Sequence, residues 1–364
     1  MTGSMYAAIA GLQTHMQKMN VIGNNIANAN TYGFKPGITS FSESMYTSIS
    51  NSTAGGAEYG GTNASQIGYG SQVASIDLNM TGGTYAMTGV PSHLYLNGNG
   101  FFLVGKKEEG VLQPNDLTLK RVGNFSLDSD GYLVDNNGYC VYGFMPQGDD
   151  AGRIVKDADG NITWDTCLRP LRVPVSAPAG IDGVDEGTAL YPTPTQNATG
   201  ITYPYTDQVD PDVDRMTNLN GLNMSVDNNG LVTLTTQDGS AVTLGVIAIG
   251  NVINPNGLTK ESDGYYKAGN NAGDVSVGTC GMIVGGYLNN VPAQDDGTTQ
   301  TTGDVMALTG VGATTILSGG LEASKTDIAT EFADLITTQR GFQANTKIIT
   351  VTDEMLSDLV SMKR

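Results

Sequence analysis

Few side chains in this sequence combine a reactive type with the spacing that chemistry requires. The histidines are His15 and His93, and His15 lies on a predicted helix without a cysteine or acid at metal-ligand spacing. Cys140 and His93 are the residues from which a thiol dyad would be built. No nucleophile motif surrounds Cys140, however, and its neighbours follow an apolar strand pattern. We therefore interpret both histidines as structural and expect no catalytic residue and no enzyme activity.

Two aspartate-rich segments and one glycine-rich turn resemble parts of binding loops. Residues 128–131 and 157–160 read Asp-x-Asp-Gly, as at the start of a calcium-binding loop. The twelfth positions are Tyr139 and Leu168, where such a loop needs a bidentate glutamate, so hairpin turns explain both segments better. The Asn-Gly-Asn-Gly turn at 97–100 lacks the helix that must follow a dinucleotide-binding glycine loop. The sequence therefore predicts no metal site and no cofactor.

The overall charge and hydropathy exclude two classes of partner. The 364 residues carry a formal net charge of -18, and nucleic-acid binding needs Lys and Arg to neutralise phosphates, so we expect no nucleic-acid partner. No run of about 18 apolar residues is present, so we expect no membrane insertion. No basic-then-apolar start resembles a cleavable signal peptide. Export would therefore need another route.

The composition is that of a surface rich in β-turns. Glycine accounts for 49 residues, nearly double the usual share of about 7%, and charged residues for 15%, against about 25% in typical proteins. The chain has an odd number of cysteines, which are widely spread along it: Cys140, Cys167 and Cys280. This arrangement does not fit a disulfide framework. We interpret these cysteines as small buried hydrophobic residues.

The N-terminal segment, residues 1–34, has the heptad spacing of a packing helix. Its only charged residue is Lys18, and uncharged residues flank the apolar seam, so the helix suits a crowded protein interior better than solvent. Asn and Gly tolerate left-handed backbone and Pro restricts the residue before it, so the helix is predicted to end at Asn28, Asn30, Gly33 and Pro36. The predicted seam consists of Met5, Leu12, Met19 and Ile26, with Ile9, Met16 and Gly23 as the companion column.

The C-terminal segment, residues 319–364, has a longer heptad pattern and predicts a long helix. Glu322, Asp327 and Glu331 lie near its start and Lys363 and Arg364 at its end, which complements the helix dipole. The first column of the predicted seam is Leu321, Ile328, Leu335, Phe342, Ile349 and Leu356. Its companion column is Phe332, Gln339, Thr346, Asp353 and Val360.

Between the terminal helices, short β-prone runs alternate with dipeptides that supply the positive φ angles of tight hairpin turns. The runs at 125–127, 132–134 and 140–144 predict a meander, and those at 231–235 and 242–249 predict a hairpin. The turn dipeptides are Asp130-Gly131, Asn137-Gly138, Asp159-Gly160, Asn229-Gly230 and Asp238-Gly239.

We therefore predict an α+β fold that is mainly β, in which paired N- and C-terminal helices form a coiled-coil-like domain joined to a β-rich middle. The predicted division assigns 1–34 to the N-terminal assembly helix, 35–72 to a connector, 73–175 and 222–318 to the two parts of a β domain, 176–221 to a proline-rich loop or reduced inserted outer domain, and 319–364 to the C-terminal assembly helix.

Motifs at both ends carry a family resemblance. Residues 23–35, Gly-Asn-Asn-Ile-Ala-Asn-Ala-Asn-Thr-Tyr-Gly-Phe-Lys, resemble the N-terminal signature of the flagellar rod and hook family. Residues 338–345, Thr-Gln-Arg-Gly-Phe-Gln-Ala-Asn, with Thr-Asp-Glu-Met-Leu at 352–356, resemble its C-terminal signature in the hook form. In the middle, 97–104, 121–134 and 254–258 are similar to β-domain motifs of the family. The signature positions are Asn24, Asn25, Ala27, Asn28, Thr31, Gly33, Phe34, Gln339, Arg340, Ala344 and Asn345.

The resemblance implies an extracellular structural subunit that is exported without a cleaved signal peptide. It would polymerise into the hollow, flexible tube of the bacterial flagellar hook, with the seam residues of both helices as the assembly interface. A head-to-tail contact repeated with a rotation that does not close generates such a filament. The implied partners are further copies of the chain, the flagellar rod, hook cap and hook-filament junction proteins, and the flagellar export apparatus.

The sequence departs from the family pattern at two places and leaves two alternatives open. Lys325-Thr326 stands where the family commonly has Asn-Val, and 176–221 is short for a full outer domain. The first alternative is a distal rod protein of the basal body. Rod subunits are usually shorter, however, and more often show Ala-Tyr in place of Gly341-Phe342. The second, from another class, is a secreted β-rich adhesin.

Overall fold

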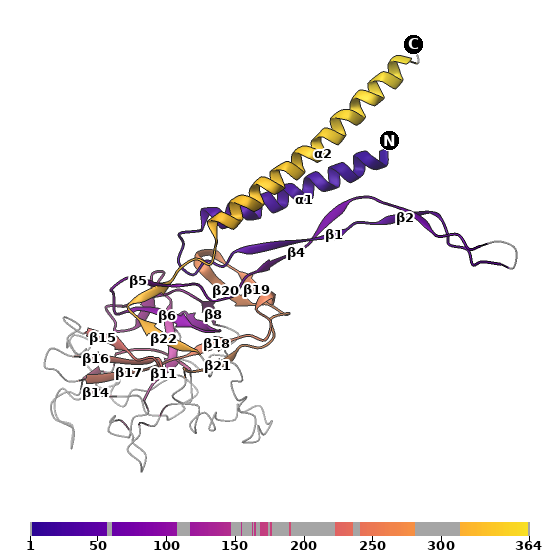
Figure 1. Ribbon diagram of the computed structural model, residues 1–364. Coiled ribbons are helices and arrows are strands. Elements are labelled where there is room, and N and C mark those ends of the chain that lie inside the picture. The colour runs from indigo at the N-terminus through magenta and orange to yellow at the C-terminus, as the bar shows by residue number, and fades with distance from the viewer. Residues whose placement is uncertain are drawn as a thin grey trace. The chain divides into compact units, whose positions relative to one another are not determined.

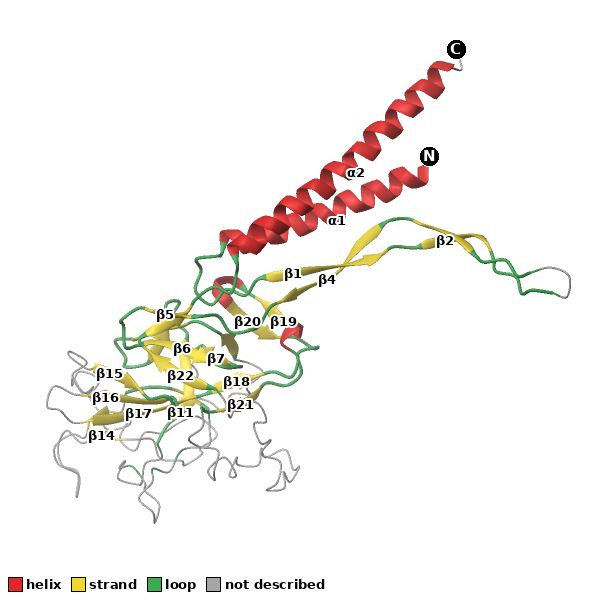
Figure 2. Ribbon diagram, viewed as in Figure 1, coloured by secondary structure: helices red, strands yellow, loops and turns green. Residues whose placement is uncertain are grey.

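The computed structural model divides the chain into two compact units, each described here by itself. Unit 1 contains Met1–Met80 and Ser324–Arg364, and unit 2 contains Thr81–Ala323. The fold is α+β and mainly β, and within the described residues both α-helices belong to unit 1 (Figure 2). The structure describes residues 2–56, 60–107, 117–146, 154, 162, 164, 168–173, 175–176, 189–190, 223–235, 241–280 and 314–362.

Unit 1 brings the two ends of the chain together as antiparallel helices, α1 (Thr2–Ala27) and α2 (Ile328–Met362), which lie side by side (Figure 1). The prediction of a helix at each end is confirmed. The C-terminal helix, however, begins at Ile328 instead of residue 319. Leu321 of the predicted seam lies instead in strand β23 (Gly320–Glu322), where it pairs with Ala86 of β5 (Tyr85–Met87).

Local hydrogen bonds set the inner ends of both helices. At the end of α1, the main-chain and side-chain N–H groups of Asn28 both donate to the carbonyl of Asn24, at 3.1 and 3.0 Å. At the start of α2, Asp327 accepts the N–H of Ala329 at 3.1 Å and the hydroxyl of Thr330 at 2.8 Å. These bonds favour the charged carboxylate and lower the pKa of Asp327. Asp327 therefore caps a helix N-terminus that would otherwise expose unpaired donors.

The segment after α1, which falls largely in the predicted connector at 35–72, contains a two-stranded β-ribbon. β1 (Gly37–Glu43) pairs antiparallel with β4 (Ser71–Leu78), and β2 (Tyr46–Ser50) pairs with β3 (Ser65–Gly68). Along β4 every second side chain is half-buried, as expected for a strand with one covered face. The Gly, Ser and Thr content of this segment concealed that alternation in the sequence.

Unit 2 is built around an antiparallel sheet of 15 strands among the described residues. Its main path runs β19-β20-β8-β7-β11-β10-β9-β6-β22, and β11 also pairs with β12 and β17. Outside this sheet, β13 (Val175–Ser176) pairs with β14 (Ala189–Leu190). The strands of the sheet are β6 (His93–Asn97), β7 (Phe101–Gly105), β8 (Thr118–Lys120), β9 (Gly123–Leu127), β10 (Leu133–Asp135), β11 (Cys140–Phe144), β12 (Arg169–Pro170), β15 (Asn223–Val226), β16 (Leu231–Thr235), β17 (Ala241–Ile247), β18 (Ile249–Asn251), β19 (Leu258–Lys260), β20 (Tyr265–Ala268), β21 (Ser276–Gly278) and β22 (Thr315–Ser318).

The turn dipeptides position these strands as predicted. Gly131, Gly138 and Gly230 adopt φ angles of 77°, 79° and 82°, which residues with a Cβ rarely adopt. They join β9 to β10, β10 to β11 and β15 to β16. The predicted meander and the β16–β17 hairpin are therefore confirmed. The turns at 159–160 and 238–239, and all of 176–221 except 176 and 189–190, lie outside the described residues.

The core of unit 2 is an apolar cluster of strand residues. In it, the rings of Phe102 and Phe125 meet nearly perpendicular at 87°, with centroids 5.1 Å apart, a geometry that aromatic pairs favour. Cys140 and Cys280 are free thiols and are buried, and burial raises the pKa of Cys280 to about 12. The prediction of small buried hydrophobic residues is confirmed for these two, and Cys167 lies outside the described residues.

A buried ion pair closes unit 2 where the chain enters and leaves it. Arg121 Nε donates to Glu322 Oε2 at 2.6 Å, and the other guanidinium nitrogens donate to main-chain carbonyls within residues 96–100. Glu322 Oε1 accepts the N–H of Gly83 at 2.6 Å. The Glu322 carboxylate, in the last segment of unit 2, thus binds both Arg121 and Gly83 of the first segment.

Candidate assembly surface

The face of α2 that packs against α1 is half apolar and half polar. Leu335, Phe342 and Ile349 of the predicted first column are half-buried, but Ile328 and Leu356 are 44% and 40% exposed. The predicted companion column is displaced by one residue. Thr338 and Thr352 are buried, and Glu331 and Asn345 contact α1. The members of the predicted companion column are exposed: Phe332, Gln339, Thr346, Asp353 and Val360.

α1 brings small residues into this contact. Ala8, Gly11, Ile22 and Asn25 are among its most buried residues, one position away from the predicted columns. A Cβ at Gly11 would lie 2.5 Å from Asn345 Nδ2, so a larger residue would displace the Asn345 side chain. Of the predicted α1 seam, the structure exposes Ile9 and Met16 and half-buries Met5, Leu12, Met19 and Ile26.

The displacement of the seam has a physical cause. A search for apolar periodicity selects the most hydrophobic columns of a helix, whereas this helix pair buries glycine, threonine and hydrogen-bonded polar residues. Several large apolar side chains remain on the outside, with Phe332 50% exposed and Met16 51% exposed. Their role in assembly stays a prediction, and their exposure in the single chain leaves them accessible to other copies.

Asn25 is the centre of the polar contact. Its Nδ2 donates to Glu331 Oε1 and to the Gly37 carbonyl, each at 2.9 Å, and its Oδ1 accepts the Gly37 N–H at 3.0 Å. Burial raises the pKa of Glu331 even though the bond from Asn25 opposes that shift. This one signature residue joins α1, the start of the ribbon and α2.

His15 lies on the same helix, between α2 and the ribbon. Its ring meets that of Phe41 edge-on, with centroids 6.0 Å apart, and a Cβ added at Gly341 would lie 2.7 Å from its Cε1. Burial, together with the positive charge of Lys18, lowers the pKa of His15. These contacts pack the imidazole against two elements, in keeping with a structural histidine.

The N-terminal signature closes α1 and ties it to the segment before α2. Asn28 Nδ2 donates to Asn24 Oδ1 at 2.6 Å, and Thr31 Oγ1 donates to Asn28 Oδ1 at 3.1 Å. Phe34 is 8% exposed, and its carbonyl accepts the N–H of Lys325 at 3.2 Å. Several signature residues therefore act within the chain, at the junction of its two ends.

The remaining signature residues divide between turn and surface. Ala27 is the last residue of α1, and Gly33 has a φ of 65°, a left-handed conformation suited to glycine. On α2, Gln339, Arg340 and Ala344 are exposed, whereas Asn345 contacts Gly11. The C-terminal signature thus has one inner residue and three surface residues.

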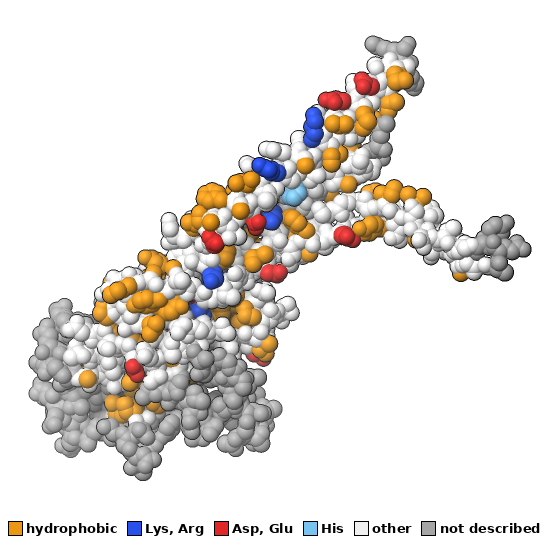
Figure 3. Space-filling model, in the orientation of Figure 1, with side chains coloured by type: hydrophobic (Ala, Val, Ile, Leu, Met, Phe, Trp, Pro, Cys, Tyr) orange, Lys and Arg blue, Asp and Glu red, His pale blue; other side chains and the backbone are white. Residues whose placement is uncertain are grey.

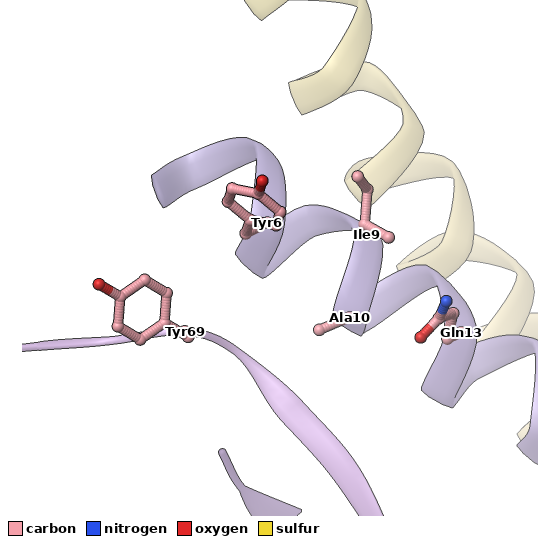
Figure 4. A pocket seen from close by; sticks show the side chains of 5 residues that line it. All are labelled: Tyr6, Ile9, Ala10, Gln13 and Tyr69. Atoms are coloured by element: carbon pink, nitrogen blue, oxygen red, sulfur yellow. The ribbon is translucent and has the colours of Figure 1, made fainter. Parts of the chain in front are cut away.

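An open apolar groove lies between α1 and the ribbon (Figure 4). Tyr6, Ile9, Ala10 and Gln13 line it from α1, and Tyr69 lines it from the loop between β3 and β4. Figure 3 shows further apolar side chains along the helices and the ribbon. The sequence analysis missed this groove because Tyr69 lay in the predicted connector. The sequence carries no clear signal for the strand beside it, because the half-buried residues Val73, Ser75 and Asp77 are mostly polar and the exposed residues Ala74 and Ile76 are apolar.

No reactive constellation accompanies these surfaces. Across the ranges that the structure describes, no three His, Cys, Asp or Glu side chains gather to hold a metal ion. His93 Nδ1 lies 2.9 Å from Thr88 Oγ1, and burial raises the pKa of Cys140, which disfavours the thiolate of the dyad considered above. None of the described helices is long and apolar enough to cross a membrane.

Two protein-family models match the two ends of the chain. Residues 5–35 match a model described as flagella basal body rod protein. Residues 317–362 match one described as the flagellar basal body rod FlgEFG protein C-terminal. The matched ranges contain α1 from residue 5 onward, with its closing turn, and the whole of α2.

Comparisons with characterised proteins extend over the full chain. The flagellar hook protein FlgE of Borreliella burgdorferi is 28% identical, and the flagellar basal-body rod protein FlgG of Bacillus subtilis is 29% identical, each over 100% of both chains. FlgE of Salmonella typhimurium is 24% identical over 99% of this chain and all of its own. A crystal structure of Helicobacter pylori flagellar hook protein FlgE2 covers 52% of this chain and 95% of its own, with 11% identity and a TM-score of 0.30. The chain is thus similar over its full length to flagellar hook and rod proteins, and its two ends match models of flagellar basal body rod proteins.

Proposed function

We propose that this chain is the subunit of the bacterial flagellar hook and polymerises through its terminal helices into a hollow, flexible tube that transmits motor torque from rod to filament. The observation that carries the proposal is the distribution of large apolar residues in unit 1. Ile328, Phe332 and Ile336 of α2 are 44 to 50% exposed, and Met16 of α1 is 51% exposed. Large apolar residues exposed along one helix pair in this way mark an interaction site.

The interface would combine the outer columns of both helices. It contains the exposed residues Ile9, Met16, Ile328, Phe332, Leu356 and Val360, and the half-buried residues Met5, Leu12, Met19, Ile26, Leu335, Phe342 and Ile349. Leu321 is excluded, because it lies in β23 of unit 2 and is 4% exposed. Each copy would contribute the same two surfaces to different neighbours, which generates an open helical polymer.

The C-terminal signature and the chain length favour the hook within the family. Gly341-Phe342 stands where rod subunits more often have Ala-Tyr, and His15 packs so closely on Gly341 that a Cβ there would lie 2.7 Å from the ring. The further partners in this proposal are the rod, the hook cap, the hook-filament junction proteins and the export apparatus. The site of action is outside the cell, after export without a cleaved signal peptide.

A distal rod protein is the second candidate, and the full-length match to the rod protein of Bacillus subtilis favours it. Electron microscopy of the purified, concentrated chain distinguishes the two. The hook proposal requires tubes that curve and bend, whereas a rod subunit would form straight, stiff ones. A chain that remains monomeric under all such conditions, with both helices formed, would contradict either role and would favour a separate function such as adhesion.

A further inference from the structure

α2 extends beyond the end of α1. It has 35 residues, whereas α1 has 26. Asn25 contacts Glu331, and Gly11 lies against Asn345, so this antiparallel register brings Thr2 opposite residue 354. Residues 355–362 therefore have no part of α1 opposite them, and Figure 1 shows α2 running on past the N-terminal end of α1. We call residues 355–362 the overhang.

The overhang continues the packing face of α2 after its partner has ended. Leu335, Phe342 and Ile349 recur every seven residues on the half-buried face, and the next member of that column is Leu356. Leu356 is 40% exposed, and Leu359, which follows it on the same side, is 48% exposed. Met355 and Met362, adjacent to Leu359 on the helix surface, are 45% and 81% exposed. This end of α2 thus presents an uncovered apolar ridge.

The groove between α1 and the ribbon is also apolar and uncharged, so it is a suitable binding site for this ridge. It is lined by Tyr6, Ile9, Ala10, Gln13 and Tyr69, none of which carries a charge at neutral pH. Tyr6 is 61% exposed and Tyr69 is 38% exposed, so the aromatic walls of the groove are uncovered in the single chain. Unbranched methionine side chains adapt to such irregular apolar walls.

The overhang of a chain cannot enter the groove of the same chain. The register places Ile9 opposite residue 347, and Leu359 lies 12 residues further along a continuous helix. At about 1.5 Å per residue, the ridge is about 18 Å beyond the groove along the axis. A straight helix does not fold back over that distance, so any overhang in the groove comes from another copy.

We propose that the overhang of one copy docks in the groove of a second copy, with Leu359 against Tyr6 and Met355 near Tyr69. The inference rests on the proposed polymer and adds a specific head-to-tail contact to it. It continues the α1–α2 packing of each chain into its neighbour, since residues 355–362 extend the face that already contacts α1. The ridge and the groove differ from each other, so the contact is heterologous and repeats without closing.

Site-specific cross-linking tests this contact. In a background with Cys140, Cys167 and Cys280 replaced by alanine, one chain carries Tyr6→Cys and another carries Leu359→Cys. The two chains are mixed, polymerised and treated with a short bifunctional thiol reagent. We expect a covalent heterodimer that forms in polymers and not in dilute monomer. A single chain with both substitutions should give a ladder of covalent multimers.

Two matched positions control for chance encounters. Asn20→Cys replaces Tyr6→Cys at an exposed residue of the same helix that lies 14 residues, about 21 Å, further along the axis. Ser361→Cys replaces Leu359→Cys at an exposed residue of the same overhang, two positions away and therefore on the other side of the helix. Cross-linking yields at either control should be at least tenfold lower. The pair Tyr69→Cys and Met355→Cys repeats the test if the first pair disturbs assembly.

The outcomes separate this inference from the proposed function. Normal tubes without heterodimers for either cysteine pair, or with equal yields at the control positions, overturn the docking contact and leave the polymer role intact. Failure of the unmodified chain to polymerise overturns the proposed function, and the docking contact falls with it. Heterodimers at both groove pairs and not at the controls establish the contact.

Discussion

The side-chain amide of Asn25 donates a 2.9 Å hydrogen bond to the carboxylate of Glu331, a residue 306 positions later in the chain. The same amide exchanges hydrogen bonds with both main-chain groups of Gly37. Asn25 is 3% exposed, so these bonds are shielded from water. The first helix, the ribbon and the last helix therefore share one buried polar residue, which fixes their register more firmly than apolar contacts would.

Replacing Asn25 with alanine should destabilise the helix pair. The Asn25→Ala change leaves the Gly37 N–H and carbonyl without their side-chain partner, and the loss of buried hydrogen bonds costs about 1 to 3 kcal/mol. The helix signal in circular dichroism, followed against urea in dilute protein, should show a lower midpoint. Asn20→Ala on an exposed part of α1 is the control and should leave the midpoint unchanged. Equal midpoints for the two variants would show that Asn25 is not a stabilising contact.

Glu331 should make the stability of the helix pair depend on pH. Burial raises its pKa above the ordinary value of 4.5, so between the pKa values of the unfolded and folded states the folded chain binds more protons than the unfolded chain. Stability contributed by this group is then complete below 4.5 and falls as pH rises through the folded pKa. Asp327 acts in the opposite direction because its pKa is lowered. The free energy of unfolding, measured with urea and plotted against pH across this range, should therefore have a different slope for the wild-type chain than for Glu331→Gln. Parallel curves would contradict the expectation.

The Arg121–Glu322 pair should dominate the stability of unit 2. The two side chains are 3% and 1% exposed, so Arg121→Met takes away the positive partner of a buried carboxylate, which costs about 3 to 5 kcal/mol. Fluorescence of Trp164, the only tryptophan, reports the unfolding of this unit. The double variant Arg121→Met/Glu322→Leu should recover much of the loss, since no charge is then left unpaired.

A surface ion pair provides the contrast. Lys107 and Asp130 lie 2.9 Å apart, but their side chains are 47% and 54% exposed. Lys107→Met should leave the urea midpoint of unit 2 almost unchanged, because water and salt screen an exposed pair. If Lys107→Met were as damaging as Arg121→Met, burial would not be the reason for the strength of the inner pair.

The parts of this fold that local sequence determines could be predicted. Gly131, Gly138 and Gly230 follow Asp or Asn and adopt the positive φ angles that tight turns need, so the order of the strands around them followed from the sequence. The heptad column through Leu335, Phe342 and Ile349 likewise identified the long helix. These signals depend on neighbours within a few residues, which a single sequence contains.

The parts of the fold that depend on contacts between distant residues could not be predicted from the sequence. Thr338 and Thr352 are buried against the helix partner, although neither differs in type from the exposed Thr346. The contact between Asn25 and Glu331 has no signature in periodicity, because its donor and acceptor are polar residues far apart in the chain. Tyr69 lines the groove because the ribbon lies beside α1, and no local sequence pattern indicates that contact.

Two aspartate substitutions on α2 should separate assembly from folding. Phe332 is 50% exposed and belongs to the outer surface, whereas Leu335 is half-buried on the face that packs against α1. Burying either side chain between copies would contribute about 1.5 to 3 kcal/mol, and an aspartate there would also have to be desolvated. Both Phe332→Asp and Leu335→Asp should therefore remain monomeric in sedimentation and form no tubes.

Their effects on the single chain should differ. Phe332→Asp should leave the helix signal and its urea midpoint unchanged, because the residue has few neighbours to lose, whereas Leu335→Asp should lower the midpoint. Trp164 fluorescence should report normal unfolding of unit 2 in both variants, since Phe332 and Leu335 belong to unit 1. Tubes of normal length from Phe332→Asp would remove the outer column from the assembly interface. An unchanged helix midpoint in Leu335→Asp would show that the helix pair is held by its polar contacts alone.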